Sequence, residues 1–229
     1  MDRVQPLVLF VDLGRISYSD ALGRQRSEHG RVVAGGSGTI AGTIFFLEHD
    51  PPVVTVSRRQ GASANVLASP ERLKALGVEL VETDRGGDVT WHGPGQLVVY
   101  LVLDLNALGL RVHGYLRLLE QAVIDALSGF GIEAARDATA TGVWVGPGKI
   151  CAMGVRLSRW VSMHGIALNV NPDLSQFDLI VPCGLAGRQV TSIARELGDR
   201  APAIDAVKLK LQECLAAHLE LARQQHAAR

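Results

Sequence analysis

Two long stretches of the chain carry hydrophobic residues at helical spacing. In the first, apolar residues recur every three or four positions from Tyr115 to Phe130, and Gly131 follows as a helix-ending glycine. The second stretch runs from Ile204 to Ala222. Because this spacing places the apolar side chains on one face of a helix, both stretches are predicted to be amphipathic helices that cover a core.

Shorter helices are predicted nearer the N-terminus. The polar, weakly periodic segment Ser17–Glu28 is one, and the glycine-rich segment Gly30–Gly38 after it is predicted to be a loop. Ser69 followed by Pro70 is a favourable helix start, since serine caps the free N–H groups and proline suits the first turn. Gly77 is predicted to end this second helix.

Short β-rich runs separate these helices. Leu97–Leu103 is almost wholly apolar, so we expect a strand buried on both faces, and we expect Ser158-Arg159-Trp160 to turn a hairpin. Strands come in adjacent pairs rather than in strict alternation with helices, which predicts an α+β fold with a mixed, largely antiparallel sheet flanked by helices. The predicted strands are Leu7–Asp12, Thr43–Glu48, Val53–Ser57, Val78–Thr83, Leu97–Leu103, Gly142–Val145, Ile150–Leu157 and Val161–Val170.

Composition indicates an ordinary globular protein. The 229 residues are 47% hydrophobic and 20% charged, with a formal net charge of zero, which argues against a disordered chain and against a general nucleic-acid binder. No apolar run approaches the ~18 residues of a membrane span, and Leu7–Val11 is too short for a signal peptide. We therefore expect a cytoplasmic protein without a membrane or nucleic-acid partner. Residues 1–229 are expected to form a single domain, with a smaller C-terminal subdomain from about residue 190 as an alternative.

The three cysteines have different settings, and none has metal-ligand spacing, so no metal site is predicted. Cys214 lies on the apolar stripe of the last helix and Cys151 lies within a predicted strand, where a free cysteine packs as a small hydrophobe. Cys183 lies in the constrained turn Pro182–Gly184, with Arg188 close in sequence. Because positive charge beside an exposed turn stabilises a thiolate, a reactive role and a packing role both stay open for Cys183.

Lysine is the candidate activator of such a thiol. Raising the thiolate fraction from a few per cent to a half needs a pKa shift of roughly 1.5 units, or about 2 kcal/mol. One ammonium ion about 4 Å away supplies about 4 kcal/mol in a partly shielded site. Lys149 begins an apolar strand after Gly146-Pro147-Gly148, an unusual place for a lysine, although a strand-edge lysine without a task is the plain alternative. The other lysines, on predicted helices where solvated charge is expected, are Lys74, Lys208 and Lys210.

A glycine-dense loop, Arg85–Gln96, leads directly into the apolar run that starts at Leu97. Glycine is used where the backbone needs positive φ or close approach to another group, so this loop is predicted to line a substrate site. The loop lacks the Gly-Lys-Ser/Thr ending of a phosphate-binding loop. His92 within it is a candidate general base or a hydrogen-bond donor to a substrate carbonyl, and His164 is placed to line a pocket. The histidines in polar or terminal settings, which give no signal, are His29, His49, His113, His218 and His226.

Four segments together resemble the lipoyl(octanoyl) transferases of lipoate biosynthesis: Arg85–Tyr100, Gly148–Arg156, His164–Asn171 and Pro182–Ser192. The pattern Arg-Gly-Gly-x-x-Thr-x-His-Gly-Pro-Gly-Gln is highly specific, and the resemblance runs over most of the chain. It implies the fold shared by lipoate-protein ligases and the catalytic domain of biotin ligases. It also implies an acyltransferase that uses a cysteine thioester and no cofactor.

Carried onto this chain, the resemblance assigns the residues of the site. Cys183 takes an octanoyl group from octanoyl-acyl carrier protein, and Lys149 lowers the pKa of its thiol. The implied acceptors are lysine amines on lipoyl domains of 2-oxoacid dehydrogenase E2 subunits and on the glycine cleavage H protein, and a monomer is expected. The implied substrate-binding residues are Arg85, Gly86, Gly87, Asp88, Val89, Thr90, Trp91, His92, Ala152, Met153, Gly154, Gly165, Ile166 and Ala167.

Two positions depart from the family pattern. Trp91 stands where tyrosine is usual, which bears on the shape of the acyl pocket, and Leu101 stands where proline often follows the tyrosine, which bears on strand geometry. The expected chemistry is physically consistent, since a covalent acyl-enzyme divides a reaction between two proteins into two separate transfers. Either Lys149 or His92 takes the proton of the acceptor amine. Candidate docking charges for an acidic carrier protein are Arg58, Arg59, Arg156 and Arg159.

Two other functions stay open. An ATP-dependent lipoate- or biotin-protein ligase on the same fold activates a free acid as an adenylate and needs no enzyme cysteine, so the Pro182–Gly184 turn counts against it. A non-catalytic binding module on the same scaffold keeps the pocket but has no need for a paired cysteine and lysine.

Overall fold

The computed structural model describes residues 7–35, 40–182 and 188–228, and its described strands form two sheets. The larger sheet has eight strands, in the order β1-β2-β6-β10-β9-β8-β7, with β11 beside β9. The β1–β2 and β11–β9 pairs are parallel, and all other neighbours in this sheet are antiparallel. Its strands are β1 (Leu7–Ile16), β2 (Ile40–His49), β6 (Gln96–Leu103), β7 (Ala135–Arg136), β8 (Val143–Val145), β9 (Gly148–Ser158), β10 (Val161–Asn169) and β11 (Gln189–Val190). The predicted α+β fold with a largely antiparallel sheet is confirmed.

The second sheet is smaller and contains β4 (Glu79–Thr83), β3 (Val53–Ser57) and β5 (Val89–His92), in that order. β3 pairs in parallel with β4 and antiparallel with β5. A separate apolar cluster forms beneath this sheet, where Val54 and Trp91 pack with Phe177 of a short 3₁₀ segment, Leu174–Leu179. The glycine-rich loop of the sequence is therefore partly a strand, because residues 89–92 alternate between this core and the opposite face.

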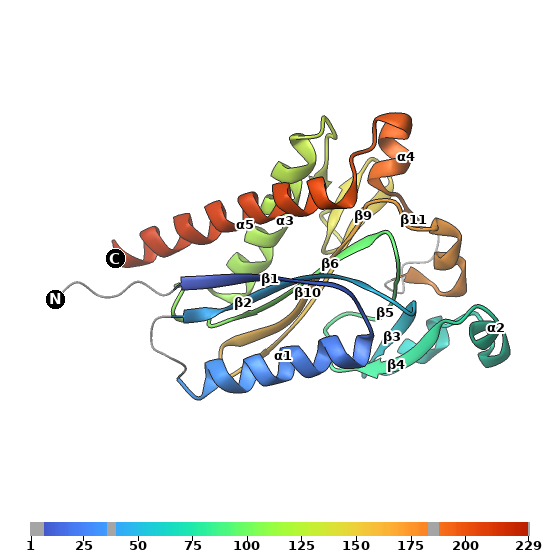
Figure 1. The fold of residues 1–229 in the computed structure, drawn as a ribbon, viewed down its shortest axis with the longest axis horizontal. Coiled ribbons are helices and arrows are strands. Elements are labelled where there is room, and N and C mark those ends of the chain that lie inside the picture. Colours follow the sequence, from blue (N-terminus) through green and yellow to red (C-terminus); the bar gives the residue numbers. More distant parts are fainter. Residues whose placement is uncertain (1–6, 36–39, 183–187, 229) are drawn as a thin grey trace.

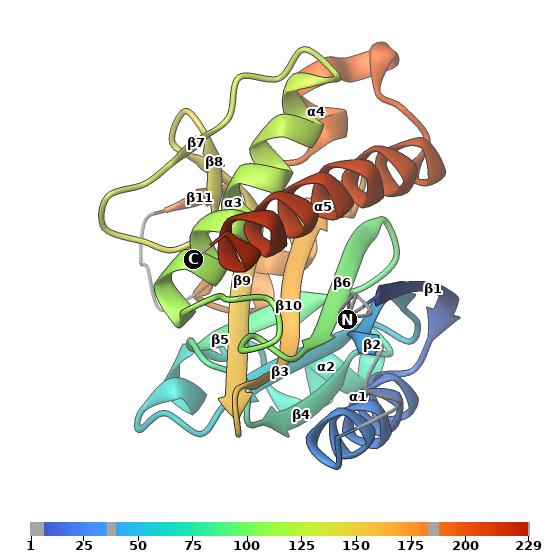
Figure 2. The ribbon, with the colours of Figure 1, turned by 90° about the vertical axis from the view of Figure 1, so that its left-hand side faces the viewer.

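Helices cover both faces of the large sheet (Figure 1). α3 (Val112–Ser128) and α5 (Ile204–Ala227) lie on one side and pack against each other, while α1 (Tyr18–Val33) lies on the other side. Figure 2 shows α3 and α5 crossing the ends of β9 and β10. The shorter helices are α2 (Pro70–Ala75) and α4 (Ile193–Leu197). Among the described residues, no helix has the length and apolarity to cross a membrane.

The central strand β6 is buried on both faces, as its apolar run predicts. All eight of its residues are buried. Leu97, Val99, Leu101 and Leu103 pack under α3 and α5, whereas Val98, Tyr100 and Val102 face α1. Because successive side chains of a strand point to opposite faces, β6 joins the two helical layers through one sheet.

One prediction needs correction. Gly30–Gly38 is not wholly a loop, because α1 continues to Val33, where the buried Val32 packs into the α1-side core; residues 36–39 lie outside the described part. The second helix and the β9–β10 hairpin agree with prediction. Arg159 and Trp160 turn the hairpin with φ of 53° and 64°, the left-handed geometry of a tight two-residue turn.

The edge of β9 matters most for the site. β8 has three residues and pairs with β9 only as far as Cys151. Beyond Cys151, no described strand pairs with that side of β9. Its partner there is the glycine-rich loop, in which the N–H of Gly86 donates to the carbonyl of Val155 at 3.2 Å.

Gly42 in β2 offers a direct test of how closely the large sheet is packed. Its φ is +143°, and a Cβ there would lie 1.9 Å from the carbonyl oxygen of Val102. We expect Gly42→Ala to lower the free energy of unfolding by about 3 kcal/mol, measured by denaturant titration. Gly23→Ala in α1 is the control, since nothing lies within 4 Å of its added Cβ and alanine should stabilise that helix by about 0.5–1 kcal/mol. Equal effects of the two substitutions would contradict this packing.

Candidate active site

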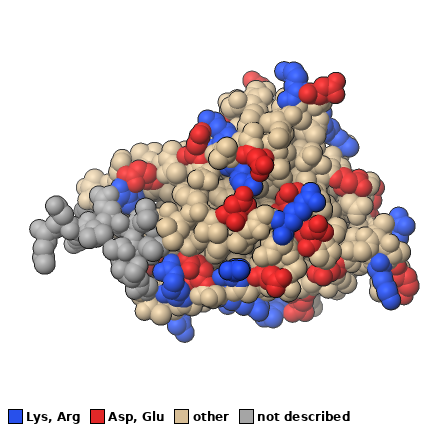
Figure 3. Space-filling model, in the orientation of Figure 1, with Lys and Arg blue, Asp and Glu red and all other residues tan. Residues whose placement is uncertain are grey.

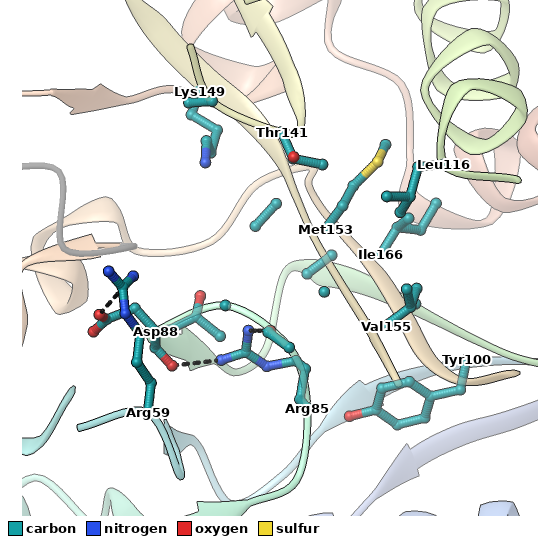
Figure 4. A pocket seen from close by; sticks show the side chains of 18 of the residues that line it. Arg59, Arg85, Asp88, Tyr100, Leu116, Thr141, Lys149, Met153, Val155 and Ile166 are labelled. Atoms are coloured by element: carbon teal, nitrogen blue, oxygen red, sulfur yellow. Dashed lines mark hydrogen bonds and ion pairs between the residues drawn. The ribbon is translucent and has the colours of Figure 1, made fainter. Parts of the chain in front are cut away.

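A cavity of about 470 Å³ lies along the free edge of β9. Its walls come from the glycine-rich loop, β5, β6, β9, β10, the start of α3 and the segment 139–141. In Figure 4, Lys149 points in at one end and Tyr100 lies at the other, with Met153, Ile166 and Leu116 between them. One wall of the cavity is thus apolar, whereas Arg59, Arg85 and Asp88 lie along another.

The structure brings together almost all the side chains that the sequence predicted for the site. The cavity is lined by Lys149 and by Arg85, Gly86, Gly87, Asp88, Thr90, His92, Ala152, Met153, Gly154, Gly165, Ile166 and Ala167. Their substrate-binding roles stay predictions, but their shared location follows from the register. Gly154 pairs with Gly165, and Ala152 pairs with Ala167, so β9 and β10 present them side by side.

Val89 and Trp91 are the predicted site residues that do not reach the cavity. They alternate along β5 with the cavity-lining Thr90 and His92, and therefore point to the opposite face. Trp91 is buried against Phe177, with ring centroids 5.4 Å apart. Tryptophan at this position consequently shapes the core of the small sheet rather than the cavity wall.

Cys183 lies outside the described residues, as do residues 184–187, so its predicted role stays a prediction. Arg188, just after this segment, donates to Asp137 at 2.6 Å, and its guanidinium lies 4.3 Å from the centre of the Trp144 ring. Hydrogen bonds from Thr139, together with Arg188, hold the pKa of Asp137 below its usual value. Arg188 is therefore committed to a carboxylate and an aromatic ring, a setting that sequence proximity to Cys183 alone did not predict.

The other two cysteines pack as the sequence indicated. Cys151 is fully buried in the core between the large sheet and α3, and burial raises the pKa of its thiol to about 12. Cys214 is partly buried on α5, and burial also raises the pKa of its thiol. Both thiols are consequently protonated at neutral pH and are poor nucleophiles.

Lys149 is buried at the start of β9, with 7% of its surface exposed. Its backbone is held between β8 and β11, where it pairs with Trp144 and Val190. Its ammonium nitrogen lies 4.9 Å from the centre of the Trp144 ring. A lysine in this position has its stem fixed by a sheet and its charged group directed toward the cavity (Figure 4).

His92 is oriented by a directional chain of hydrogen bonds. The Asn169 amide donates to the carbonyl of Thr191, and the Gln96 amide donates to Asn169 Oδ1. Gln96 Oε1 is therefore the acceptor for His92 Nδ1 at 2.7 Å. With its proton on Nδ1, a neutral His92 presents Nε2 as an acceptor, so it is not placed to donate to a substrate carbonyl.

Burial keeps His92 neutral. Desolvation, followed by the nearby His49, lowers the pKa of His92 well below its usual value. A group with such a low pKa holds a proton poorly at neutral pH, which weakens the case for His92 as the general base. His92 serves better as a fixed, uncharged hydrogen-bond acceptor at the cavity wall.

His49 and Tyr100 form a second fixed pair, which the sequence did not indicate. His49 was expected in a polar setting, but it is fully buried and lies against the rings of Tyr18, Tyr100 and His92. Its Nδ1 lies 3.2 Å from the carbonyl of Ile16 and its Nε2 lies 2.7 Å from the Tyr100 hydroxyl. Because a carbonyl only accepts, Nδ1 carries the proton and Tyr100 donates to Nε2. The hydroxyl oxygen of Tyr100 is left as an acceptor at the cavity.

His164 lies beneath Tyr100 and is held in a less common conformation. Its φ is 59°, its N–H donates to Gln25 at 2.7 Å, and its ring Nε2 contacts Asp84 at 2.9 Å. Burial lowers the pKa of His164 although Asp84 opposes this. The sequence placed His164 at a pocket, and the structure places it behind the wall formed by Tyr100, with ring centroids 6.1 Å apart.

The sequence contains one feature that points to the buried His49–Tyr100 pair. Tyr100 is the polar side chain in the otherwise apolar run Leu97–Leu103, and such a residue needs a buried partner. That partner, His49, comes from β2, 51 positions away in sequence. No local pattern connects the two positions, because β2 and β6 meet only through the folded sheet.

Neutral buried histidines predict an acid-sensitive fold. Burial lowers the pKa of His49 from 6.5 to about 4. Its contribution to stability is therefore complete above pH 6.5 and is lost as the pH falls toward 4, because the unfolded chain then binds the extra proton. We expect His49→Gln to reduce the loss of unfolding free energy between pH 7 and pH 5 by about 2 kcal/mol, measured by urea titration at both pH values.

The control for this measurement is His226→Gln, because His226 is exposed near the end of α5. This variant should retain the full acid sensitivity of the unmodified chain. An identical pH dependence for His49→Gln and His226→Gln would show that His49 is not a source of the acid sensitivity.

Comparisons with known proteins agree with this geometry. The family model described as "Lipoyl protein ligase A/B catalytic domain" matches residues 21–216. An octanoyltransferase of Chloroflexus aurantiacus is 49% identical over 202 residues, which cover 87% of this chain and 88% of the relative. An octanoyltransferase of Solibacter usitatus is 51% identical over 189 residues, which cover 82% of this chain and 83% of the relative.

Solved structures share the fold at low sequence identity. Lipoate-protein ligase A bound with ATP is 17% identical with a TM-score of 0.72, over 94% of this chain and 86% of that one. Biotin protein ligase from Aquifex aeolicus, in complex with biotin and ATP, is 14% identical with a TM-score of 0.55, over 95% of this chain and 72% of that one. The match to the family model and the identity to the two octanoyltransferases show that the chain belongs to the lipoyl protein ligase A/B catalytic domain family.

Proposed function

We propose that the protein is an acyltransferase that moves an octanoyl group from octanoyl-acyl carrier protein to lysine amines of lipoyl domains. The observation that carries this proposal is its 49% and 51% identity, over most of the chain, to two octanoyltransferases. The proposed acceptors are the lipoyl domains of 2-oxoacid dehydrogenase E2 subunits and the glycine cleavage H protein. The cavity supports the proposal, since its apolar walls suit an alkyl chain and Lys149 lies at one end.

The proposed reaction has two acyl transfers. In the first, the Cys183 thiolate attacks the thioester carbonyl of the donor, and the carrier thiol leaves as the enzyme thioester forms. In the second, the acceptor amine attacks that thioester, an amide forms, and the Cys183 thiolate leaves. The amine loses one proton in this step, and the leaving thiol of the carrier gains one in the first.

We propose that Lys149, rather than His92, gives a proton to the carrier thiol in the first transfer and takes the proton that the amine loses in the second. Lys149 reaches the cavity from β9, and its ammonium stabilises a nearby thiolate by several kcal/mol, about 4 at an effective dielectric of 20. His92 is disfavoured because burial lowers its pKa well below the usual value. This division leaves His92 and Tyr100 as uncharged acceptors at the far wall.

Arginines near the cavity are proposed to dock the donor. The side chains of Arg58 and Arg59 are mainly exposed, and they contact Glu82 at 2.9 Å and Asp88 at 3.8 Å. Arg156 contacts Asp84 at 3.0 Å. An acidic carrier protein competes for the exposed Arg58–Glu82 pair at modest cost, since exposed salt bridges contribute only about 0–1 kcal/mol. On the face in Figure 3, basic and acidic side chains are interspersed, so docking on that face would rest on local pairs.

We also propose that one chain is one catalytic domain that works as a monomer in the cytoplasm. Reduced thiols are maintained in the cytoplasm, which the proposed thiolate chemistry requires.

Cys183→Ala should abolish octanoyl transfer. Intact mass measurement after incubation with octanoyl-acyl carrier protein should show one hydroxylamine-labile octanoyl adduct, and peptide mapping should locate it at Cys183. Cys214→Ser is the control, because Cys214 is a partly buried thiol on α5, and this variant should form the adduct normally. Full activity of Cys183→Ala with ATP and free octanoate would favour the ligase alternative and sink the proposal.

Lys149→Ala should slow octanoyl transfer by about 100-fold or more, because a positioned proton-transfer group typically contributes 10²–10⁴-fold. The same variant should slow alkylation of Cys183 at pH 7, followed by peptide mass mapping. Lys74→Ala in α2 is the matched control, since Lys74 is exposed and lies outside the cavity. Unchanged transfer and alkylation in Lys149→Ala would exclude the proposed role.

A further inference from the structure

Trp144 and Lys149 lie opposite each other where β8 meets β9. They are paired in the register of the two strands. The ammonium nitrogen of Lys149 lies 4.9 Å from the centre of the indole ring, within the distance at which a ring face attracts a cation. Trp144 is 3% exposed and does not line the cavity, so any effect on substrate has to pass through a neighbour.

The Trp144 ring is itself held by two contacts. Its Nε1 donates to the carbonyl of Ala140 at 3.3 Å, and the guanidinium of Arg188 lies 4.3 Å from its centre. Arg188 in turn pairs with Asp137 at 2.6 Å. Arg188 is thus the second cation beside the Trp144 ring, and the carboxylate of Asp137 balances its charge.

The aliphatic part of the Lys149 side chain lies beside Gly142. A Cβ at Gly142 would lie 3.4 Å from Lys149 Cε and 2.6 Å from the carbonyl oxygen of Cys151. The N–H of Gly142 donates to the buried carboxylate of Glu120 at 3.3 Å. Glu120 is in turn paired with Arg117 and Arg136. The segment between β7 and β8 is thereby fixed beside the lysine.

Positioning is needed because a lysine side chain is flexible. Its four-carbon stem carries about 2 kcal/mol of rotamer entropy, and a freely rotating ammonium would spend little time at the reacting atoms. An aromatic face attracts the charge without accepting its proton. The ring face therefore restricts where the ammonium lies without itself accepting a proton from it.

We infer that Trp144 is a positioning residue for acyl transfer, which holds the Lys149 ammonium at the cavity wall while Ala140 and the Arg188–Asp137 pair orient the ring. This inference rests on the proposed function, because it assigns no chemistry to Trp144 and acts only through Lys149. The substrate carbonyl and the transferred proton meet Lys149, and Trp144 touches neither.

The test replaces Trp144 with mono-, di- and trifluorotryptophan, which keep the shape of the ring and weaken its attraction for cations stepwise. We expect the logarithm of kcat for octanoyl transfer to fall with each fluorine, to about tenfold below the unmodified enzyme, while KM for octanoyl-acyl carrier protein stays within twofold. The same substitutions at Trp160 are the control. Trp160 also has an arginine over its ring, Arg111 at 5.2 Å, but it lies outside the cavity.

A second arm separates positioning from a structural role. Fluorination at Trp144 should leave the residual rate of Lys149→Ala unchanged, because residues that act through one group have non-additive effects. Trp144→Phe should keep most of the rate that Trp144→Leu loses, since phenylalanine still presents a ring face.

Each result is decisive. A kcat that does not depend on fluorination, with Lys149→Ala impaired, would overturn this inference alone. An equal fluorine effect with and without Lys149 would do the same, because it would show that the ring serves Arg188 or the fold. Full activity of Lys149→Ala would overturn the proposed role of Lys149 and this inference together.

Discussion

β8 begins only at Val143, opposite Cys151 of β9, and this is the constraint on which the site depends. Hydrogen bonding along the edge of a strand has to be completed by something, and β8 completes it only as far as Cys151. From Ala152 onward, the edge of β9 faces the glycine-rich loop. The cavity lies along this edge of β9.

The glycines of the loop follow from that edge. A Cβ on Gly86 would lie 2.7 Å from the carbonyl oxygen of Val155, and a Cβ on Gly154 would lie 2.6 Å from the carbonyl oxygen of Gly86. Each glycine permits the other backbone to approach. Arg85 completes the arrangement by donating to the carbonyls of Gly86 and Asp88 at 2.6 and 3.0 Å, which fixes the curvature of the loop. The glycine-rich loop therefore covers the unpaired edge of β9 and also lines the cavity.

The sequence predicted the parts of this arrangement that are local. Helical spacing located α3 and α5, the apolar run located β6, and glycine density located the loop. The sequence did not predict that residues 89–92 form a strand, because four residues are too short for alternation to stand out within a glycine-rich segment. This is also why Trp91 was grouped with His92, although the two side chains point to opposite faces. The His49–Tyr100 pair was missed for a different reason, since it depends on strands that meet only in the folded sheet.

Lys149 and the histidine rings at the other end of the cavity have different surroundings. At one end, hydrogen-bond chains that finish at backbone carbonyls fix the tautomers of His49 and His92, and burial keeps both rings neutral. The two neutral rings add no charge to that of Arg85, which lines the cavity near His92. At the other end, β8 places an indole beside Lys149. β8, which leaves the edge of β9 unpaired beyond Cys151, thus also presents the indole that lies against the Lys149 ammonium. Extending β8 at its N-terminal end would cover that edge.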